Sequence, residues 1–166
     1  MGAIDELLAR HRAALANRSC CDADVGHAKP RLRTVVLTCM DARIDPAKAL
    51  GLRSGDAHVL RNAGGLMTDD ALRSLVLSQQ LLGTQEVMVI QHTSCGVHGL
   101  RDADLAGRLT SQTGVDLGLE FGGFDDVEAS VRASLARVRD CAWLTRRDAA
   151  RGFVYDVATG RLHEVA

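Results

Sequence analysis

The sequence lacks an excess of either charge, because 20 lysines and arginines are balanced by 21 aspartates and glutamates among 166 residues. Without surplus positive charge the chain has no general attraction to polyanions, so we expect no nucleic-acid partner. It also lacks any apolar run near the roughly 18 residues that span a bilayer, so we expect no membrane partner. Met1 to Glu6 has neither the basic and apolar regions of a signal peptide nor the Ser or Thr at position 6 of a myristoylation motif. We therefore expect a soluble, cytoplasmic protein.

The cysteines do not indicate a disulfide framework, because this chain shows no sign of secretion. In such a chain, five cysteines favour free thiols or metal ligands. Cys20, Cys21 and Cys141 lie outside any recognisable motif, and we expect them to be buried or incidental thiols. Cys39 and Cys95 are different, since each lies at or just beyond the end of a strand-like segment.

Two β-branched, apolar segments run directly into reactive side chains. Thr34 to Thr38 leads into Cys39-Met40-Asp41-Ala42-Arg43, and Glu86 to Gln91 leads into His92-Thr93-Ser94-Cys95-Gly96. Short apolar runs of this kind are typical of buried strands. Two strands would thus bring thiols and an imidazole to one place.

The remaining sequence predicts helices around these strands and a hairpin at the end. Apolar periodicity and capping residues predict helices at Ile4–Asn17, 45–51, Asp69–Leu82, Leu100–Leu109 and Asp125–Arg139. A further strand is expected at Ala57–Arg61, and Gly152–Val157 with Arg161–Val165 is expected to form a hairpin around residues 158–160. The segments Ser19–Arg33 and Thr113–Gly123 are expected to be irregular.

Alternation of strands and helices with short connections predicts an α/β fold. We expect a central, mainly parallel β-sheet flanked by helices, with an N-terminal helix and a C-terminal strand or hairpin. Residues 1–166 are expected to be a single domain, in which residues 1–33 form an N-terminal helical arm and loop. In such sheets ligand sites lie at the carboxyl ends of the strands, so one cleft should gather the residues that follow them. Those residues are Cys39, Gly64, Gly65, His92 and Cys95.

The chemistry depends on Cys39, His92 and Cys95, whose two thiolates and one imidazole suit Zn²⁺. Three protein ligands leave a fourth tetrahedral position for water, as in catalytic zinc sites. Arg43 could keep Asp41 ionised and aimed at a metal-bound water, whose proton Asp41 would orient or accept. Each pattern alone has a simpler explanation, namely a loop histidine beside a buried thiol and a surface ion pair.

Taken together, Cys39-Met40-Asp41-Ala42-Arg43, Arg61-Asn62-Ala63-Gly64-Gly65 and His92-Thr93-Ser94-Cys95-Gly96 resemble the β-class carbonic anhydrases. The similarity is close from Val35 to Gly96, and Arg151 to Gly160 resembles the closing strand region of small bacterial members. The resemblance implies that Cys39, His92 and Cys95 bind zinc and that Asp41 and Arg43 form a catalytic dyad. We also expect Gly64 and Gly65 to contact the substrate.

The reaction implied is the reversible hydration of CO2 to bicarbonate and a proton by a zinc-bound hydroxide, assisted by the dyad. In some members Asp41's counterpart occupies the fourth zinc position, so Asp41 is also a candidate ligand in a closed state. The family further implies a homodimer or homotetramer, with the N-terminal helix on the partner and the sites near the interface.

Three side chains outside the ligand set bear on regulation and proton transfer. Members with a regulatory bicarbonate pocket carry Trp where this chain has Val36, so we do not expect that pocket here. His98 could shuttle protons, but an exposed loop histidine is the simpler interpretation. His58 is expected to be a packed or hydrogen-bonded strand residue.

Three alternatives remain open from the sequence. The same ligands could serve hydrolysis of another small heteroallene such as CS2. A non-catalytic, zinc-stabilised interaction module would explain the ligands but leave Asp41 and Arg43 without a role. A redox or sulfur-transfer protein would need a nucleophilic, metal-free Cys39.

Overall fold

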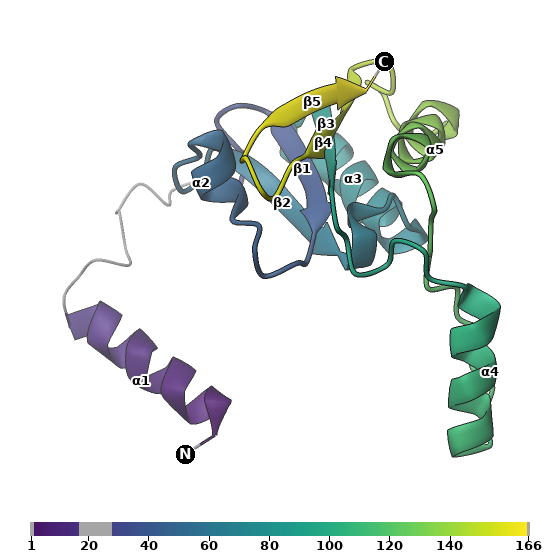
Figure 1. Ribbon diagram of the computed structural model, residues 1–166. Coiled ribbons are helices and arrows are strands. Elements are labelled where there is room, and N and C mark those ends of the chain that lie inside the picture. Colours follow the sequence, from purple (N-terminus) through teal and green to yellow (C-terminus); the bar gives the residue numbers. More distant parts are fainter. Residues whose placement is uncertain (1, 17–27, 166) are drawn as a thin grey trace.

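A computed structural model describes residues 2–16 and 28–165 of the chain. It contains one five-stranded sheet with helices around it (Figure 1). The strands are β1 (Thr34–Cys39), β2 (Ala57–Asn62), β3 (Glu86–His92), β4 (Ala150–Tyr155) and β5 (Leu162–Val165). The helices are α1 (Ala3–Ala16), α2 (Pro46–Leu50), α3 (Asp69–Leu82), α4 (Asp102–Thr113) and α5 (Val127–Asp140), with a 3₁₀ turn at Ala63–Gly65. These elements confirm the α/β class.

The sheet has the strand order β2-β1-β3-β4-β5, in which only the β4–β5 pair is antiparallel. β1 therefore has a parallel neighbour on each side. In the register, Cys39 lies opposite Asn62 of β2, and His92 lies opposite Tyr155 of β4. Because parallel strands end at the same edge, Cys39 and His92 are brought to adjacent positions there.

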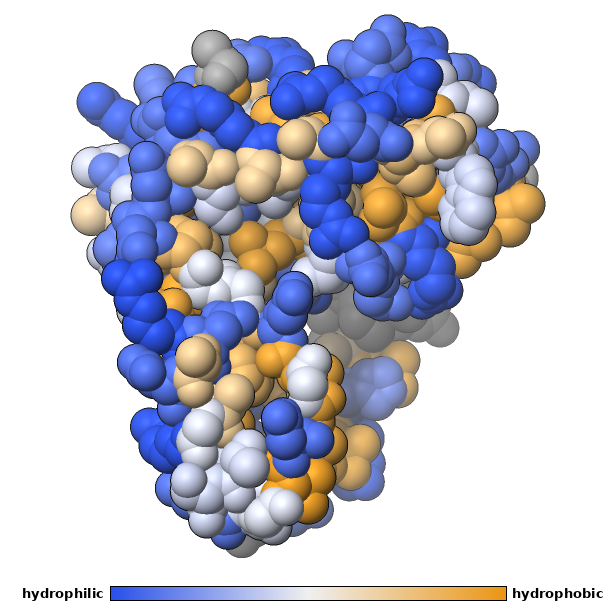
Figure 2. Space-filling view, turned by 90° about the vertical axis from the view of Figure 1, so that its right-hand side faces the viewer, coloured by the Kyte–Doolittle hydropathy of each residue, from blue (hydrophilic) through white to orange (hydrophobic). Residues whose placement is uncertain are grey.

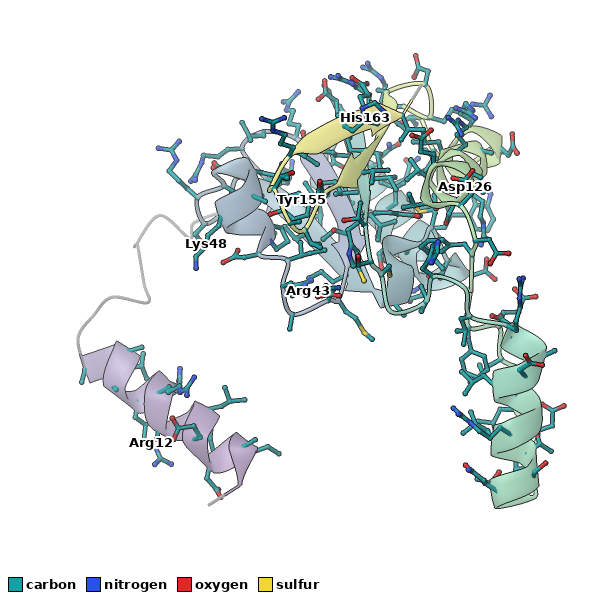
Figure 3. The ribbon with its side chains drawn as sticks, in the orientation of Figure 1. Arg12, Arg43, Lys48, Asp126, Tyr155 and His163 are labelled. Atoms are coloured by element: carbon teal, nitrogen blue, oxygen red, sulfur yellow. The ribbon has the colours of Figure 1, made fainter. Side chains whose placement is uncertain are left out.

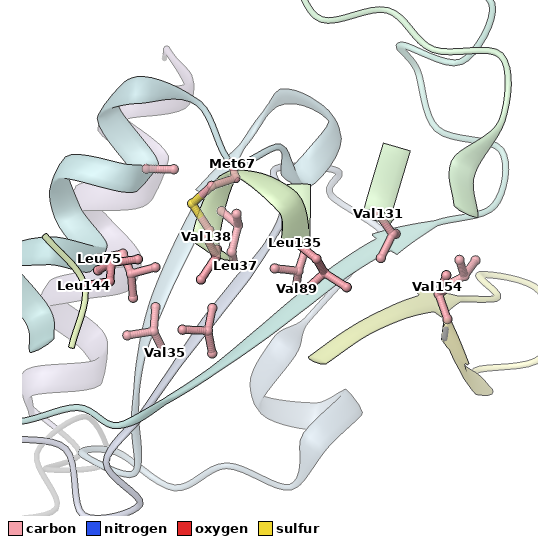
Figure 4. Packing of buried hydrophobic residues seen from close by; sticks show 13 residues of the cluster. Val35, Leu37, Met67, Leu75, Val89, Val131, Leu135, Val138, Leu144 and Val154 are labelled. Carbon is pink, nitrogen blue, oxygen red and sulfur yellow. The ribbon is translucent and has the colours of Figure 1, made fainter. Parts of the chain in front are cut away.

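Helices α3 and α5 cover one face of the sheet and form the main core with it (Figure 4). Alternate residues of β1 and β3 point toward these helices, as the two-residue period of a strand requires. The fully buried core includes Val35, Leu37, Val89, Leu75 and Val131. Burial of five such side chains stabilises the fold by roughly 1.5–3 kcal/mol each.

Gly152 of β4 permits the close approach of α5 to the sheet. A β-carbon at this position would lie 2.3 Å from Val131 Cγ1 and 2.9 Å from Leu135 Cδ1, which real contacts do not allow. The absence of a side chain therefore sets the distance between β4 and α5. This packing continues the core from β1 and β3 to the last strands.

The ends of the shorter elements follow their capping residues. Asp45 caps α2 by accepting hydrogen bonds from the amides of Ala47 and Lys48, and Gly51 ends it in a left-handed conformation, as expected. The interval predicted for the fourth helix was too short, because α4 starts at Asp102 and continues to Thr113, where Gly114 supplies the left-handed stop. Asn17 and residues 19–27 of the predicted loop lie outside the described residues.

Two helices, α1 and α4, project from the sheet body (Figure 1). α1 has no buried residue. α4 is tied to the body by Asp102, whose carboxylate accepts hydrogen bonds from the amides of Phe121, Gly122 and Gly123 at 2.7–3.0 Å. Among the described residues, no helix is long and apolar enough to cross a membrane.

Candidate metal centre

Three soft donors converge at the carboxyl edge of the sheet. Cys39 is the last residue of β1, His92 is the last residue of β3, and Cys95 follows three residues later. One donor atom from each lies within 4.8 Å of the other two, and all three residues are buried. Within the described part of the chain, this is the one cluster of three or more such residues that could hold a metal ion.

The distances and hydrogen bonds of this cluster fit a zinc ion. The Sγ atoms of Cys39 and Cys95 lie 4.0 Å apart, which is far beyond a disulfide bond of about 2.05 Å. Two sulfurs at about 2.3 Å from a tetrahedral zinc would lie about 3.8 Å apart. Two thiolates and an imidazole are also the donor types that zinc prefers.

The orientation of His92 leaves one ring nitrogen available for a metal. Its Nδ1 lies 2.9 Å from the carbonyl oxygen of Thr93. Because a carbonyl only accepts, Nδ1 must carry the proton and Nε2 must present its lone pair. Nε2 is buried and has no hydrogen-bond partner among the described residues. An unpaired buried nitrogen is unfavourable, and a role as a metal ligand explains why it is found here.

Burial makes the protonation of this cluster sensitive to a cation. It lowers the pKa of His92 and raises the pKa of Cys95, because desolvation disfavours the charged form of each group. The Cys95 thiolate therefore requires compensating positive charge. A divalent cation held between the three donors would supply that charge.

Asp41 and Arg43 form a forked ion pair next to these donors. Arg43 Nε donates to Asp41 Oδ1 at 2.9 Å, and Nη2 donates to Oδ2 at 2.7 Å. The Arg43 amide also donates to Oδ1 at 2.9 Å. Asp41 Oδ2 lies 3.9 Å from His92 Nε2, so the carboxylate borders the metal-binding donors. The hydrogen bond from the Arg43 side chain, above all, holds the pKa of Asp41 well below its usual range.

The comparisons with known proteins identify the family. A family model described as carbonic anhydrase matches residues 34–114. Beta-carbonic anhydrase 1 of Mycobacterium tuberculosis is 42% identical over 136 residues, which are 82% of this chain and 83% of that protein. The chain belongs to the β-carbonic anhydrases. The hydration of CO2 is the function of this family.

One solved structure and one relative with a different named activity are also similar to this chain. The crystal structure of carbonic anhydrase from Streptococcus mutans matches with a TM-score of 0.89 and 40% identity, covering 100% of this chain and 99% of that one. A carbon disulfide hydrolase of Acidithiobacillus thiooxidans is 34% identical over 151 residues, which cover 78% of this chain and 75% of that protein. The β-carbonic anhydrase fold is thus shared with proteins of a second named activity.

Arg61 is a site residue to which the sequence assigned no role. Its Nε donates to the carbonyl of Cys39 at 2.9 Å, and its Nη2 donates to the carbonyl of Asp41 at 2.8 Å. One guanidinium from β2 thus fixes the backbone on both sides of Met40. Its place in the motif Arg61-Asn62-Ala63-Gly64-Gly65 was the one available signal.

Gly64 and Gly65 have backbone roles in this β-carbonic anhydrase. Both have positive φ angles, 77° and 64°. A β-carbon on Gly65 would lie 2.9 Å from the backbone nitrogen of Cys39 and from the carbonyl oxygen of Ile90. The 3₁₀ turn can therefore pack against the ends of β1 and β3 only with glycine there. A contact of either glycine with substrate stays a prediction.

The other candidate residues lie outside the donor cluster. His58 bonds to Ser78 Oγ at 2.7 Å and to the Ala28 carbonyl at 2.9 Å, as a hydrogen-bonded strand residue should. His98 is exposed and bonds to the Asp125 carbonyl at 3.0 Å. Cys141 packs partly buried against the main core. Cys20 and Cys21 lie outside the described residues.

Proposed function

We propose that this chain catalyses the reversible hydration of CO2 to bicarbonate and a proton, with Zn²⁺ held by Cys39, His92 and Cys95. The observation that carries the proposal is the convergence of these buried donors beside the forked Asp41–Arg43 pair. When bound, zinc would lower the pKa of a water ligand and so supply the nucleophile at moderate pH. The remaining chemistry belongs to side chains of this chain.

Asp41 is the residue that would orient the attacking water. Arg43 keeps its carboxylate ionised, since the pKa of Asp41 is held well below its usual range. Such a carboxylate is a strong hydrogen-bond acceptor but a weak base, so Oδ2 would hold the water's proton in a hydrogen bond. The released proton would then pass to solvent or buffer.

The forked pair opposes the closed state of the site, in which Asp41 would occupy the fourth zinc position. Asp41 could become a metal ligand only by giving up its two side-chain bonds to Arg43 and the bond from the Arg43 amide. We therefore propose that Arg43 biases the site toward the open state. A non-catalytic zinc module would leave this pairing without a role.

Hydrolysis of CS2 is the related alternative, and a direct comparison of substrates distinguishes the two. Purified protein with measured zinc content is assayed by stopped flow for CO2 hydration and by sulfide release for CS2. We expect rapid CO2 hydration, with CS2 turnover slower by orders of magnitude. Rapid sulfide release with negligible CO2 hydration would replace the proposed substrate, and the absence of both activities in zinc-loaded protein would overturn the proposal.

We further propose that the chain forms a homodimer or homotetramer in which α1 lies on a partner copy. Ile4, Leu7, Leu8 and Leu15 of α1 are 46–73% exposed, a cost that burial against another chain would remove. An apolar groove of about 340 Å³, which could receive such a helix, lies between α4 and residues 115–121.

Figure 2 shows apolar residues along one side of the projecting part that contains α4. We assign this groove to the partner's α1.

Sedimentation at micromolar concentration tests the assembly. The double variant Leu7→Ser/Leu8→Ser should dissociate more readily than wild type, because it removes the apolar contacts. Arg12→Ser, which changes a polar position of the same helix (Figure 3), is the matched control and should not. A wild-type protein that is monomeric and fully active would contradict the assembly.

We also propose a cytoplasmic, single-domain protein. The separated thiols of Cys39 and Cys95 must stay reduced to act as ligands, which a reducing compartment favours. The buried cluster that includes Val35 and Val165 is continuous across the sheet. Limited proteolysis should release no stable fragment smaller than residues 28–165, and a stable internal fragment would refute the single domain.

A further inference from the structure

Ser94, between two of the candidate ligands, has an uncommon backbone conformation. Its φ angle is 53°, and among the described residues Arg33 is the one other non-glycine residue with positive φ. L-residues with a β-carbon rarely adopt this region, and β-branched residues least of all. The conformation therefore needs a reason in the surrounding contacts.

The carbonyl oxygen of Ser94 accepts a hydrogen bond from Arg43 Nη2 at 2.8 Å. The same nitrogen donates to Asp41 Oδ2 at 2.7 Å. One guanidinium nitrogen thus joins the segment between His92 and Cys95 to the carboxylate that borders their donor atoms. The sign of φ at position 94 sets the direction in which the chain, and with it this carbonyl, points.

This contact matters because the Arg43 side chain is 51% exposed. Such a half-exposed arginine loses rotamer freedom when it pairs with Asp41, whose side chain is only 17% exposed, and a further fixed contact offsets that cost. The Ser94 carbonyl gives Arg43 a second, fixed acceptor outside that pair. It thereby orients the fork toward Asp41.

We propose that Ser94 is a positioning residue, whose left-handed backbone directs its carbonyl to Arg43 and so fixes Asp41 beside the metal site. The inference rests on the proposed function and names a residue that controls the geometry of the dyad. Serine is suited to the position because it is small and unbranched. Glycine and asparagine should serve equally, since both tolerate positive φ.

The test is a series of substitutions at position 94 in the full-length, zinc-loaded protein. We expect kcat/KM for CO2 to be within about twofold of wild type for Ser94→Gly and Ser94→Asn. It should stay similar for Ser94→Ala, which is also small and unbranched, and fall by about tenfold to a hundredfold for the β-branched Ser94→Val. Zinc content should stay at one per chain throughout, and the Arg43 Nε–H NMR signal should broaden or shift in Ser94→Val alone.

A double-mutant cycle separates positioning from a general loss of structure. If Ser94 acts through Arg43, Ser94→Val should cause almost no additional loss in an Arg43→Lys background. Arg33→Val is the matched control, because it places the same side chain at a positive φ of 52° before β1. It should lower stability without selective loss of kcat/KM.

Three results would overturn the proposal. They are an unchanged kcat/KM in Ser94→Val, loss of zinc from that variant, or a full additive loss in the Arg43→Lys background. Zinc loss would mean that the turn serves Cys95 instead. If wild-type protein showed no CO2 hydration, the proposed function would fail, whereas the zinc and NMR readouts would still report on the contact between Ser94 and Arg43.

Discussion

Arg43 donates two parallel side-chain hydrogen bonds to Asp41, from Nε to Oδ1 at 2.9 Å and from Nη2 to Oδ2 at 2.7 Å. Forked pairs of this kind fix the direction of a carboxylate as well as its charge. A lysine at position 43 could supply the charge but not the second bond. The geometry thus separates two functions of Arg43 that can be tested independently.

Arg43→Lys should lower kcat/KM for CO2 by about a hundredfold, the size of effect expected when a group that orients the reacting water is misplaced. Zinc content should be unchanged, because position 43 supplies no metal ligand. The measurement is stopped-flow hydration with zinc quantified in the same samples. Arg151→Lys is the matched control, since Arg151 holds Glu164 in the same fork away from the site. Near-wild-type rates for Arg43→Lys across pH would refute a role for the fork.

Asp41→Asn should retain zinc and lose most activity. The amide keeps the shape of the side chain but carries no charge and can present a donor to the water. Its pairing with Arg43 would also lose the attraction between opposite charges. The same assay gives the result as kcat/KM at several pH values. An Asp41→Asn variant as fast as wild type would show that the carboxylate takes no part in the reaction.

Gly152→Ala should destabilise the fold by about 1–3 kcal/mol through overpacking. A methyl group there would press on Val131 at 2.3 Å and on Leu135 at 2.9 Å. Gly107→Ala is the control, because a β-carbon at that position of α4 meets nothing within 4 Å, and it should stabilise the helix by about 0.5–1 kcal/mol. Urea unfolding measures both, and a neutral Gly152→Ala would contradict the tight β4–α5 packing.

Acid should loosen the connection of α4 to the body. Hydrogen bonds from the amides of Gly123, Gly122 and Phe121 lower the pKa of Asp102 below its usual range. A depressed carboxylate pKa contributes stability above the unfolded value near 3.9, and this is lost as pH falls through the lowered value. Amide exchange, corrected for intrinsic rates, should show protection at residues 121–123 at about pH 6 that is lost at an acidic pH at which Asp102 is protonated.

Asp102→Ala should show no such protection at either pH, which separates the local effect from acid release of a metal. Asp104→Ala, in the same first turn of α4, should leave it intact. Equal protection in wild type and Asp102→Ala near neutral pH would show that the carboxylate does not hold the segment.

The sequence predicted the strand ends and caps because these depend on local chemistry. Thr34 to Cys39 is apolar and β-branched, and Asp45 and Gly51 bound a helix by rules that operate within a few residues. It also brought Cys39, His92 and Cys95 together, since parallel strands end at one edge. The strand order β2-β1-β3-β4-β5 fits that expectation but was not specified by it.

Contacts of a side chain with distant backbone carbonyls could not be predicted from the sequence. Arg61 bonds to the carbonyls of Cys39 and Asp41, and such acceptors exist in every residue, so no side-chain pattern marks them. The positive φ angle of Ser94 could not be predicted either, because serine adopts negative φ in most contexts. The end of α4 was different, since Gly114 offered a stop signal that the prediction overlooked.

If one zinc ion held by Cys39, His92 and Cys95 makes this chain a CO2 hydratase, activity should follow the amount of bound zinc. The most direct measurement is CO2 hydration by stopped flow as metal-free protein is titrated with zinc, beside Cys39→Ser as a ligand variant. We expect activity to rise in proportion to bound zinc until one ion is bound per chain, and we expect Cys39→Ser to bind zinc weakly and to remain inactive. Zinc-loaded wild-type protein without activity, or full activity in protein free of metal, would contradict this expectation.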